Sequence, residues 1–270
     1  MNELSITLIQ STLFWKNIQK NLEHFTKLIN KIEKTNIILL PEMFNTAFCP
    51  DEVSLAEEMQ GKTINWMKKI ALNNACSVVG TLMVQEKNKI FNRLVWVSEN
   101  GQTQFYDKRH LFSFAEESKT ITKGEKRLIL LEKGWKICPL ICYDLRFPVF
   151  SRNNIDYDIL IYLANWPNKR INSWNTLLKA RSIENQCYTI GVNRIGEDGN
   201  NILFSGHSKI IDPLGNEIAS TNTGEEEILT MKVTKEILDY QRNKMNYLQD
   251  RDNFSLHKFP NLFLNPNLAE

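Results

Sequence analysis

Three side chains that could perform nucleophilic chemistry directly follow predicted strands. They are Glu42, Lys108 and Cys142, and the segments before them are 37–41, 103–106 and 137–141. Residues just after strands often carry function, because the sheet holds them rigidly. A cysteine attacks a carbonyl carbon as its thiolate, but an ordinary thiol is mostly protonated at neutral pH. A desolvated glutamate could accept the thiol proton, and a lysine ammonium could stabilise the oxyanion that forms.

Each of these residue types also has a more common structural role. A single cysteine at a strand end is usually a small buried apolar residue. A glutamate after a proline, or a lysine in a charged segment such as 107–110, is usually solvated. Spacing alone therefore does not decide between the two interpretations.

The local motifs favour the catalytic interpretation. In chain order they are Leu-Pro-Glu-Met-Phe at 40–44, Tyr-Asp-Lys-Arg-His-Leu-Phe at 106–112 and Leu-Ile-Cys-Tyr-Asp-Leu-Arg-Phe-Pro at 140–148. Together they closely resemble the nitrilase, or carbon–nitrogen hydrolase, superfamily, and the resemblance runs from about residue 4 to about residue 233. It implies a Glu42–Lys108–Cys142 triad that requires no metal and no organic cofactor.

The resemblance also implies a second glutamate and an oxyanion hole. Glu116 and Glu117 are both candidates for the glutamate that holds Lys108, and we favour Glu117 because Glu-Ser-Lys-Thr resembles a stretch of omega-amidase-like members. The alternative is that both are exposed loop acids. The backbone N–H of Tyr143, directly after the nucleophile, is the expected oxyanion donor.

Residues 143–148 and the Ala-Asn-Trp-Pro segment at 164–167 are similar to the omega-amidase branch. That branch implies hydrolysis of the distal amide of small dicarboxylic monoamides, such as 2-oxoglutaramate and succinamate, through a thioester. Two alternatives remain open. One is an amidase of the same family with another substrate, such as deaminated glutathione, and the other is a non-catalytic dimeric binding protein.

A small anionic substrate needs a cation for its far carboxylate. Arg146 is the candidate, because arginine pairs with carboxylates through two hydrogen bonds. An ion pair between Arg146 and a nearby acid, Asp144 or Glu184, is an equally weighted alternative. The side chains of Phe44 and Trp166, together with that of Tyr143, are expected to form the pocket wall, although aromatic core packing is an equal alternative.

Two histidines and a second cysteine need separate roles. A Cys–His dyad would use His110 or His207, but the motif resemblance assigns catalysis to the glutamate and lysine. We therefore expect His110 to be a structural hydrogen-bonding residue. Cys138 shares the strand before the nucleophile and is expected to pack in the core.

The elements that position these residues follow from hydrophobic periodicity. Strands are predicted over 4–10, 36–40, 76–84, 90–97, 103–106, 134–141, 158–164, 187–192, 208–212 and 227–233, and helices over 16–34, 62–74 and 173–184. This mixture indicates a layered α/β protein. The resemblance specifies a four-layer α-β-β-α sandwich and a homodimer or higher homo-oligomer, with an interface that includes helices near 147–153 and 173–184. We expect a single domain over residues 1–270, with its core at 4–233 and a C-terminal tail at 234–270.

Composition excludes several classes of protein. The 270 residues carry a formal charge of +2, with 33 basic and 31 acidic residues, so neither nucleic acid nor a membrane is an expected partner. No segment resembles a signal peptide or a spanning helix. Five widely spaced cysteines suit a reducing cytoplasm and show no zinc-binding spacing. The expected partner is a small amide in the cytoplasm.

Overall fold

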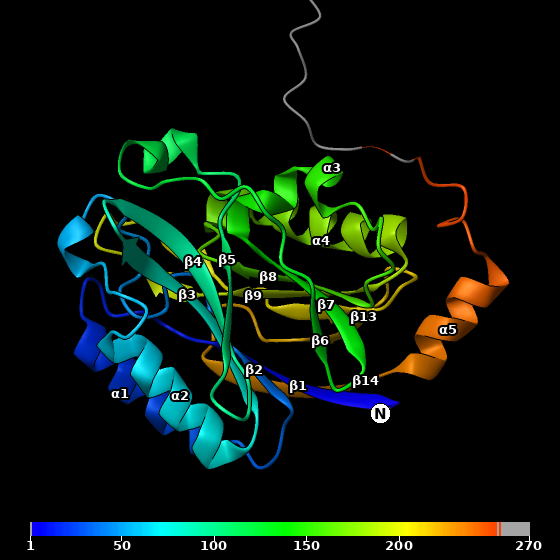
Figure 1. Cartoon of the computed structure of the whole chain (residues 1–270), viewed down its shortest axis with the longest axis horizontal. Helices are drawn as coiled ribbons and strands as arrows, with labels where there is room; N and C mark the ends of the chain where they lie inside the picture. Colours follow the sequence, from blue (N-terminus) through cyan, green and yellow to red (C-terminus); the bar gives the residue numbers. More distant parts are fainter. Residues whose placement is uncertain (1, 253, 255–270) are drawn as a thin grey trace, which may run out of the picture.

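Two six-stranded sheets pack face to face, and helices cover their outer faces (Figure 1). The structure is a computed structural model, and it describes residues 2–252 and 254. Its layers are helices, sheet, sheet and helices, which confirms the predicted α-β-β-α sandwich. Residues 253 and 255–270 of the predicted tail lie outside the described residues.

The first sheet provides Glu42 and Lys108. Its strands lie in the order β14-β1-β2-β3-β4-β5. Their bounds are β1 (Glu3–Gln10), β2 (Ile37–Leu39), β3 (Ser77–Glu86), β4 (Lys89–Val97), β5 (Thr103–Asp107) and β14 (Glu227–Thr234). Strands β1, β2 and β3 are parallel to one another. Strand β14 pairs antiparallel with β1, β4 pairs antiparallel with β3, and β5 pairs antiparallel with β4.

The second sheet provides Cys142. Its strands lie in the order β13-β12-β9-β8-β7-β6. Their bounds are β6 (Leu130–Glu132), β7 (Trp135–Ile141), β8 (Ile159–Ala164), β9 (Tyr188–Asn193), β12 (Lys209–Ile211) and β13 (Glu217–Ser220). Strands β7, β8 and β9 are parallel. A separate hairpin joins β10 (Ile195–Glu197) and β11 (Leu203–Ser205).

The helices pack on the outer faces of the two sheets. On the first sheet lie α1 (Ile18–Ile29) and α2 (Lys62–Asn74), and on the second lie α3 (Pro148–Ser151) and α4 (Ile171–Asn185) (Figure 1). Helix α5 (Lys235–Lys244) follows the last strand. Short 3₁₀ turns are η1 (Val53–Leu55), η2 (Ser113–Ala115), η3 (Glu117–Lys119), η4 (Cys142–Arg146) and η5 (Asn168–Arg170).

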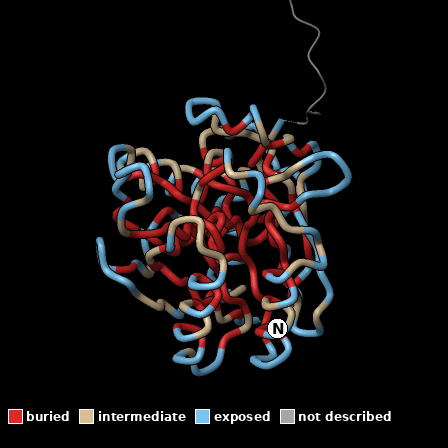
Figure 2. Tube along the Cα trace, turned by 90° about the vertical axis from the view of Figure 1, so that its left-hand side faces the viewer, coloured by how far each residue is buried: buried red, intermediate tan, exposed pale blue. Residues whose placement is uncertain are grey.

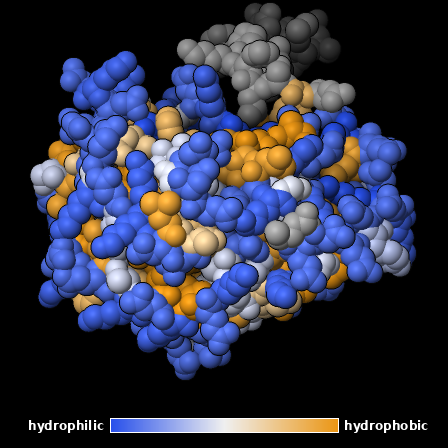
Figure 3. Space-filling view, turned by 60° about the horizontal axis from the view of Figure 1, so that its bottom comes forward, coloured by the Kyte–Doolittle hydropathy of each residue, from blue (hydrophilic) through white to orange (hydrophobic). Residues whose placement is uncertain are grey.

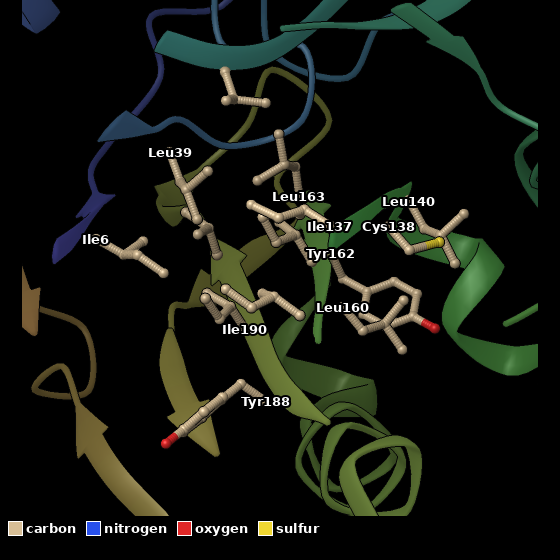
Figure 4. Packing of buried hydrophobic residues seen from close by; sticks show 14 of the residues in the cluster. Ile6, Leu39, Ile137, Cys138, Leu140, Leu160, Tyr162, Leu163, Tyr188 and Ile190 are labelled. Atoms are coloured by element: carbon tan, nitrogen blue, oxygen red, sulfur yellow. The ribbon is translucent and has the colours of Figure 1, made fainter. Parts of the chain in front are cut away.

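Strand alternation separates two apolar clusters. Ile37 and Leu39 of β2 belong to the cluster between the sheets, whereas Ile38 belongs to the cluster under α1 and α2. Figure 4 shows Ile6 and Leu39 of the first sheet facing Ile190 and its neighbours in the second. The buried segments in Figure 2 run through the middle of the molecule. Because apolar side chains are buried on both faces of each sheet, close packing holds the strand ends firmly.

Several elements differ from the sequence prediction, which omitted the short strands β6, β10 and β11. Helix α1 ends at Ile29, short of residue 34, because its last turn tightens and the N–H of Ile32 bonds the carbonyl of Ile29 at 2.9 Å. The turn at 213–216 leads into β13, a strand that the prediction omitted. The segment predicted as an aperiodic tail begins with α5, whose first turn is capped by Thr234.

Figure 3 shows one face of the molecule in space-filling form. On the face in Figure 3, hydrophilic side chains predominate and apolar side chains form scattered patches. No helix among residues 2–252 is long and apolar enough to cross a membrane.

Candidate active site

Four sequence-predicted side chains meet where the two sheets end. Glu42 follows β2, Lys108 follows β5, Cys142 follows β7, and Glu117 opens η3. Glu42 and Glu117 are fully buried, Lys108 is 1% exposed and Cys142 is 9% exposed. The structure therefore places two acids, one amine and one thiol together with almost no solvent contact, where their mutual electrostatic interactions are strong.

Lys108 binds both carboxylates. Its Nζ lies 2.8 Å from Oε1 of Glu42, and 3.1 and 2.9 Å from the two carboxylate oxygens of Glu117. Burial alone lowers the pKa of Lys108, but the negative charges of Glu117 and Glu42 outweigh it and raise that pKa above 10.5. The two carboxylates therefore favour the charged form of this amine. Glu116, the other candidate, is exposed and forms an ion pair with Lys119 at 2.7 Å.

Cys142 sits in a sharp turn between β7 and η4. Its φ is +40°, a left-handed conformation that costs a residue with a side chain about 1 kcal/mol or more. Asp144 holds this turn, because its Oδ2 accepts the N–H of Ile141 at 3.0 Å and the hydroxyl of Tyr106 at 2.7 Å. The backbone N–H of Tyr143 directly follows the thiol in this turn.

The thiol of Cys142 has a pKa well above its ordinary value. Burial is the main cause, and the charge of Glu42 adds to it, whereas Lys108 opposes both. The resting thiol is therefore protonated at neutral pH. The sulfur contacts the backbone carbonyl oxygen of Asn165 at 3.9 Å, and the carboxylate of Glu42 is near enough to raise the pKa of the thiol.

Two asparagines that the sequence analysis did not identify complete the cluster. The backbone N–H of Asn165 donates to Oε2 of Glu42 at 2.9 Å. Asn92 Nδ2 donates to Glu42 at 2.9 Å and to Glu117 at 3.0 Å. A signal existed for Asn92: it is a polar residue inside the apolar segment 90–97, which the sequence predicts as a strand.

One pocket opens onto the thiol of Cys142. The residues that line it are Glu42, Phe48, Lys108, Phe112, Ala115, Cys142, Tyr143, Arg146, Asn165, Trp166, Pro167, Arg170 and Ile202. Arg146 stacks on Trp166 at 4.8 Å, and Arg170 stacks on Phe112 at 5.1 Å. The structure thus places Tyr143, Arg146 and Trp166 where the sequence predicted, and it adds Arg170, Phe48 and Phe112.

The acids considered as ion-pair partners of Arg146 are engaged elsewhere. Glu184 binds Arg181 at 2.9 Å, and Asp144 accepts from Tyr106, from Ile141 and from the N–H and Nδ1 of His110. Among the described residues, neither Arg146 nor Arg170 has a carboxylate within ion-pair distance. Burial, together with the positive charge of Arg146, lowers the pKa of Arg170. The pocket therefore has the charge and shape to receive an anion.

The prediction for Phe44 is wrong. Its side chain is fully buried on the helix side of the first sheet, 5.6 Å from Phe25 and 5.8 Å from Trp66 between ring centroids. It points away from the pocket because Met43 has a positive φ of 44° and turns the chain. Phe48, 5.3 Å from the Lys108 ammonium, provides the aromatic wall in its place.

His110 lies beside the site without contacting the thiol. Its Nδ1 lies 2.8 Å from Oδ1 of Asp144, and its ring stacks on Phe147 at 3.8 Å, which fits a structural hydrogen-bonding role. Cys138 is fully buried in the core, where burial raises its pKa to about 12. In the part of the chain that the structure describes, no cluster of three His, Cys, Asp or Glu residues could hold a metal.

Known proteins with similar sequences show which family this chain belongs to. The family profile described as carbon-nitrogen hydrolase matches residues 5–242. The chain belongs to the carbon–nitrogen hydrolase family. The omega-amidase YafV of Escherichia coli is 40% identical over 95% of this hydrolase and 100% of its own length. The 2-oxoglutaramate amidase of Bacillus subtilis is 31% identical over 83% of this chain and 87% of its own.

A solved structure is similar to this hydrolase throughout. A CN-hydrolase superfamily protein from Xanthomonas campestris superimposes with a TM-score of 0.93 and 35% identity, over 95% of this chain and 100% of that one. That protein carries an arsenic adduct in its active site. The predicted superfamily and fold are confirmed, and the protein is an enzyme that hydrolyses carbon–nitrogen bonds.

Proposed function

We propose that this hydrolase releases ammonia from the distal amide of small dicarboxylic monoamides, such as 2-oxoglutaramate and succinamate. The observation that carries the proposal is the pair Arg146 and Arg170, which line the same pocket as Cys142. A substrate with an amide at one end and a carboxylate at the other would meet the thiol and a guanidinium together. The relatives named omega-amidase and 2-oxoglutaramate amidase support the same substrate class.

The first chemical step forms a bond between Cys142 Sγ and the amide carbon. Because the resting thiol is protonated, Glu42 takes its proton as the sulfur attacks. The carbonyl π electrons move onto oxygen. The backbone N–H of Tyr143 and the ammonium of Lys108 stabilise this oxyanion.

Lys108 has a hydrogen available for that purpose. An ammonium has three N–H donors, and here one goes to Glu42 and one is shared by the two oxygens of Glu117. The third remains for the oxyanion, since Lys108 lines the pocket. Glu117, which is fully buried behind Lys108, fixes the direction of this donor.

The second step expels ammonia. Glu42 returns the thiol proton to the amide nitrogen, the carbon–nitrogen bond breaks, and a thioester on Cys142 remains. Glu42 then takes a proton from water, and the hydroxide attacks the thioester. The carbon–sulfur bond breaks, the dicarboxylic acid is released, and the proton on Glu42 returns to the sulfur of Cys142. The net reaction consumes one water and gives one acid and one ammonia.

The experiment is ammonia release from a panel of substrates: 2-oxoglutaramate, succinamate, glutamine, deaminated glutathione and a simple nitrile, with Cys142→Ala as control. We expect strong release from the first two and none in the variant. Release from deaminated glutathione alone would retain the mechanism and reject the proposed substrate. Silence on the whole panel would reject the proposed substrate class.

A further inference from the structure

Asn92 joins the two carboxylates of the buried cluster. It lies in β4, is fully buried, and its backbone carbonyl accepts the N–H of Lys108 at 3.0 Å. Its Nδ2 group donates one hydrogen bond to Oε1 of Glu42 and one to Oε1 of Glu117. The side chain of Asn92 therefore bonds both carboxylates, and its backbone carbonyl bonds the backbone of the lysine between them.

The orientation of this amide follows from its neighbours. Asn92 Oδ1 lies 3.0 Å from the hydroxyl of Thr81, and that hydroxyl accepts the N–H of Met43 at 2.8 Å. Since the Thr81 oxygen accepts from Met43, its proton is free to donate to Oδ1. The Nδ2 group then faces two carboxylates, which accept only. The chain Met43–Thr81–Asn92 has a donor and an acceptor at each step.

The charges explain why this amide is needed. Glu42 and Glu117 share one ammonium, so the buried cluster has two negative charges and one positive. Two carboxylates at one site favour a shared proton. The groups that face them are Lys108, the neutral thiol of Cys142 and, across the pocket, the guanidinium groups of Arg146 and Arg170. The two Asn92 donors stabilise the ionised form of both acids.

We propose that Asn92, oriented by Thr81, is a positioning residue that keeps Glu42 and Glu117 ionised together on Lys108. Glu42 is then free to take the proton of Cys142. The proposal deepens the proposed function and rests on it for the identity of the base. It assigns to Asn92 no contact with substrate.

The test compares kcat/KM against pH for the wild type, Asn92→Leu, Thr81→Val and Thr81→Ser. Asn92→Leu removes both side-chain donors, and this loss favours the protonated form of the Glu42 and Glu117 carboxyl groups. The acid limb of the kcat/KM profile should therefore move up by about one pH unit or more, and kcat should be at least about tenfold lower. Thr81→Val should shift it in the same direction by about half as much. Thr81→Ser retains the hydroxyl and should restore the wild-type profile.

Thr189→Val is the matched control. Thr189 is also a fully buried strand threonine, but its hydroxyl contacts only the Cys187 sulfur, at 3.8 Å. It should leave the acid limb in place. An unshifted acid limb in Asn92→Leu, even with reduced kcat, would overturn the proposal. If that variant does not fold, an unshifted limb in Thr81→Val would overturn it equally.

A second readout does not need an amide substrate. Alkylation of Cys142 by iodoacetamide requires the same proton acceptor, so its onset with pH should move upward in Asn92→Leu as the acid limb does. If the wild type hydrolyses no amide and the alkylation onset still shifts, the proposed function fails and the role of Asn92 stands. If the wild type hydrolyses the amides strongly and neither pH profile shifts in Asn92→Leu, the proposed function stands and the role of Asn92 fails.

Discussion

Arg170→Met tests the specificity that the pocket implies. The methionine retains apolar contact with Phe112 and removes the charge. The backbone carbonyl of Arg170, which accepts the indole N–H of Trp166 at 2.8 Å, is unchanged. A hydrogen bond to a charged partner contributes about 1.5–3 kcal/mol, so kcat/KM for succinamate should fall about 10- to 150-fold.

The assay is ammonia release from succinamate and from butyramide, which has a methyl group in place of the carboxylate. Butyramide cannot use the guanidinium, so its kcat/KM should be nearly unchanged and the preference for succinamate should collapse. Lys169→Met is the control, because Lys169 is the exposed neighbour in η5 and loses the same charge. An equal loss on both substrates, or no loss on succinamate, would refute the reasoning.

Three further predictions follow from the cluster and its surroundings. Cys142→Ala should abolish turnover, and Glu42→Gln and Lys108→Ala should each lower kcat by about 10²- to 10⁴-fold; near-normal ammonia release in any of the three would contradict the mechanism. Because the pKa of Lys108 is raised above 10.5 by the two carboxylates, its charged form persists and kcat/KM should stay level from pH 8 to pH 10; a decline in that window would show that the ammonium is less stabilised. Phe44→Leu should lower the free energy of unfolding by about 1 kcal/mol and leave KM unchanged, which denaturant titration and steady-state kinetics check; a raised KM would return Phe44 to the pocket wall.

The layer arrangement could be predicted because strand periodicity reports which face is buried. Segments 37–40 and 159–164 read as apolar strands and are buried on both faces in the structure. The grouping of Glu42, Lys108 and Cys142 could be predicted because each follows a strand and each lies in a family motif. The short strands β6, β10, β11 and β13 and helix α5 were missed. The three-residue strands are too short to show a period, and β13 and α5 are largely polar without a complete apolar face.

The rest of the site depends on geometry that periodicity does not contain. Phe44 and Phe48 lie in the same loop, and the positive φ of Met43 decides which one faces the pocket. Arg170 stands in a polar segment that resembles ordinary surface, and only the folded loop brings it beside Arg146. Asn92 needs the exact cross-strand register, in which Arg93 pairs with Asp107.

The most direct test of the central claim is rapid quenching of the enzyme with succinamate, followed by mass analysis of the intact chain and its peptides. We predict a transient gain equal to one succinyl group, located on the peptide that contains Cys142 and formed as ammonia appears. Cys142→Ala should show neither the adduct nor ammonia. Ammonia release by Cys142→Ala, or an acyl group on any other residue, would contradict the account.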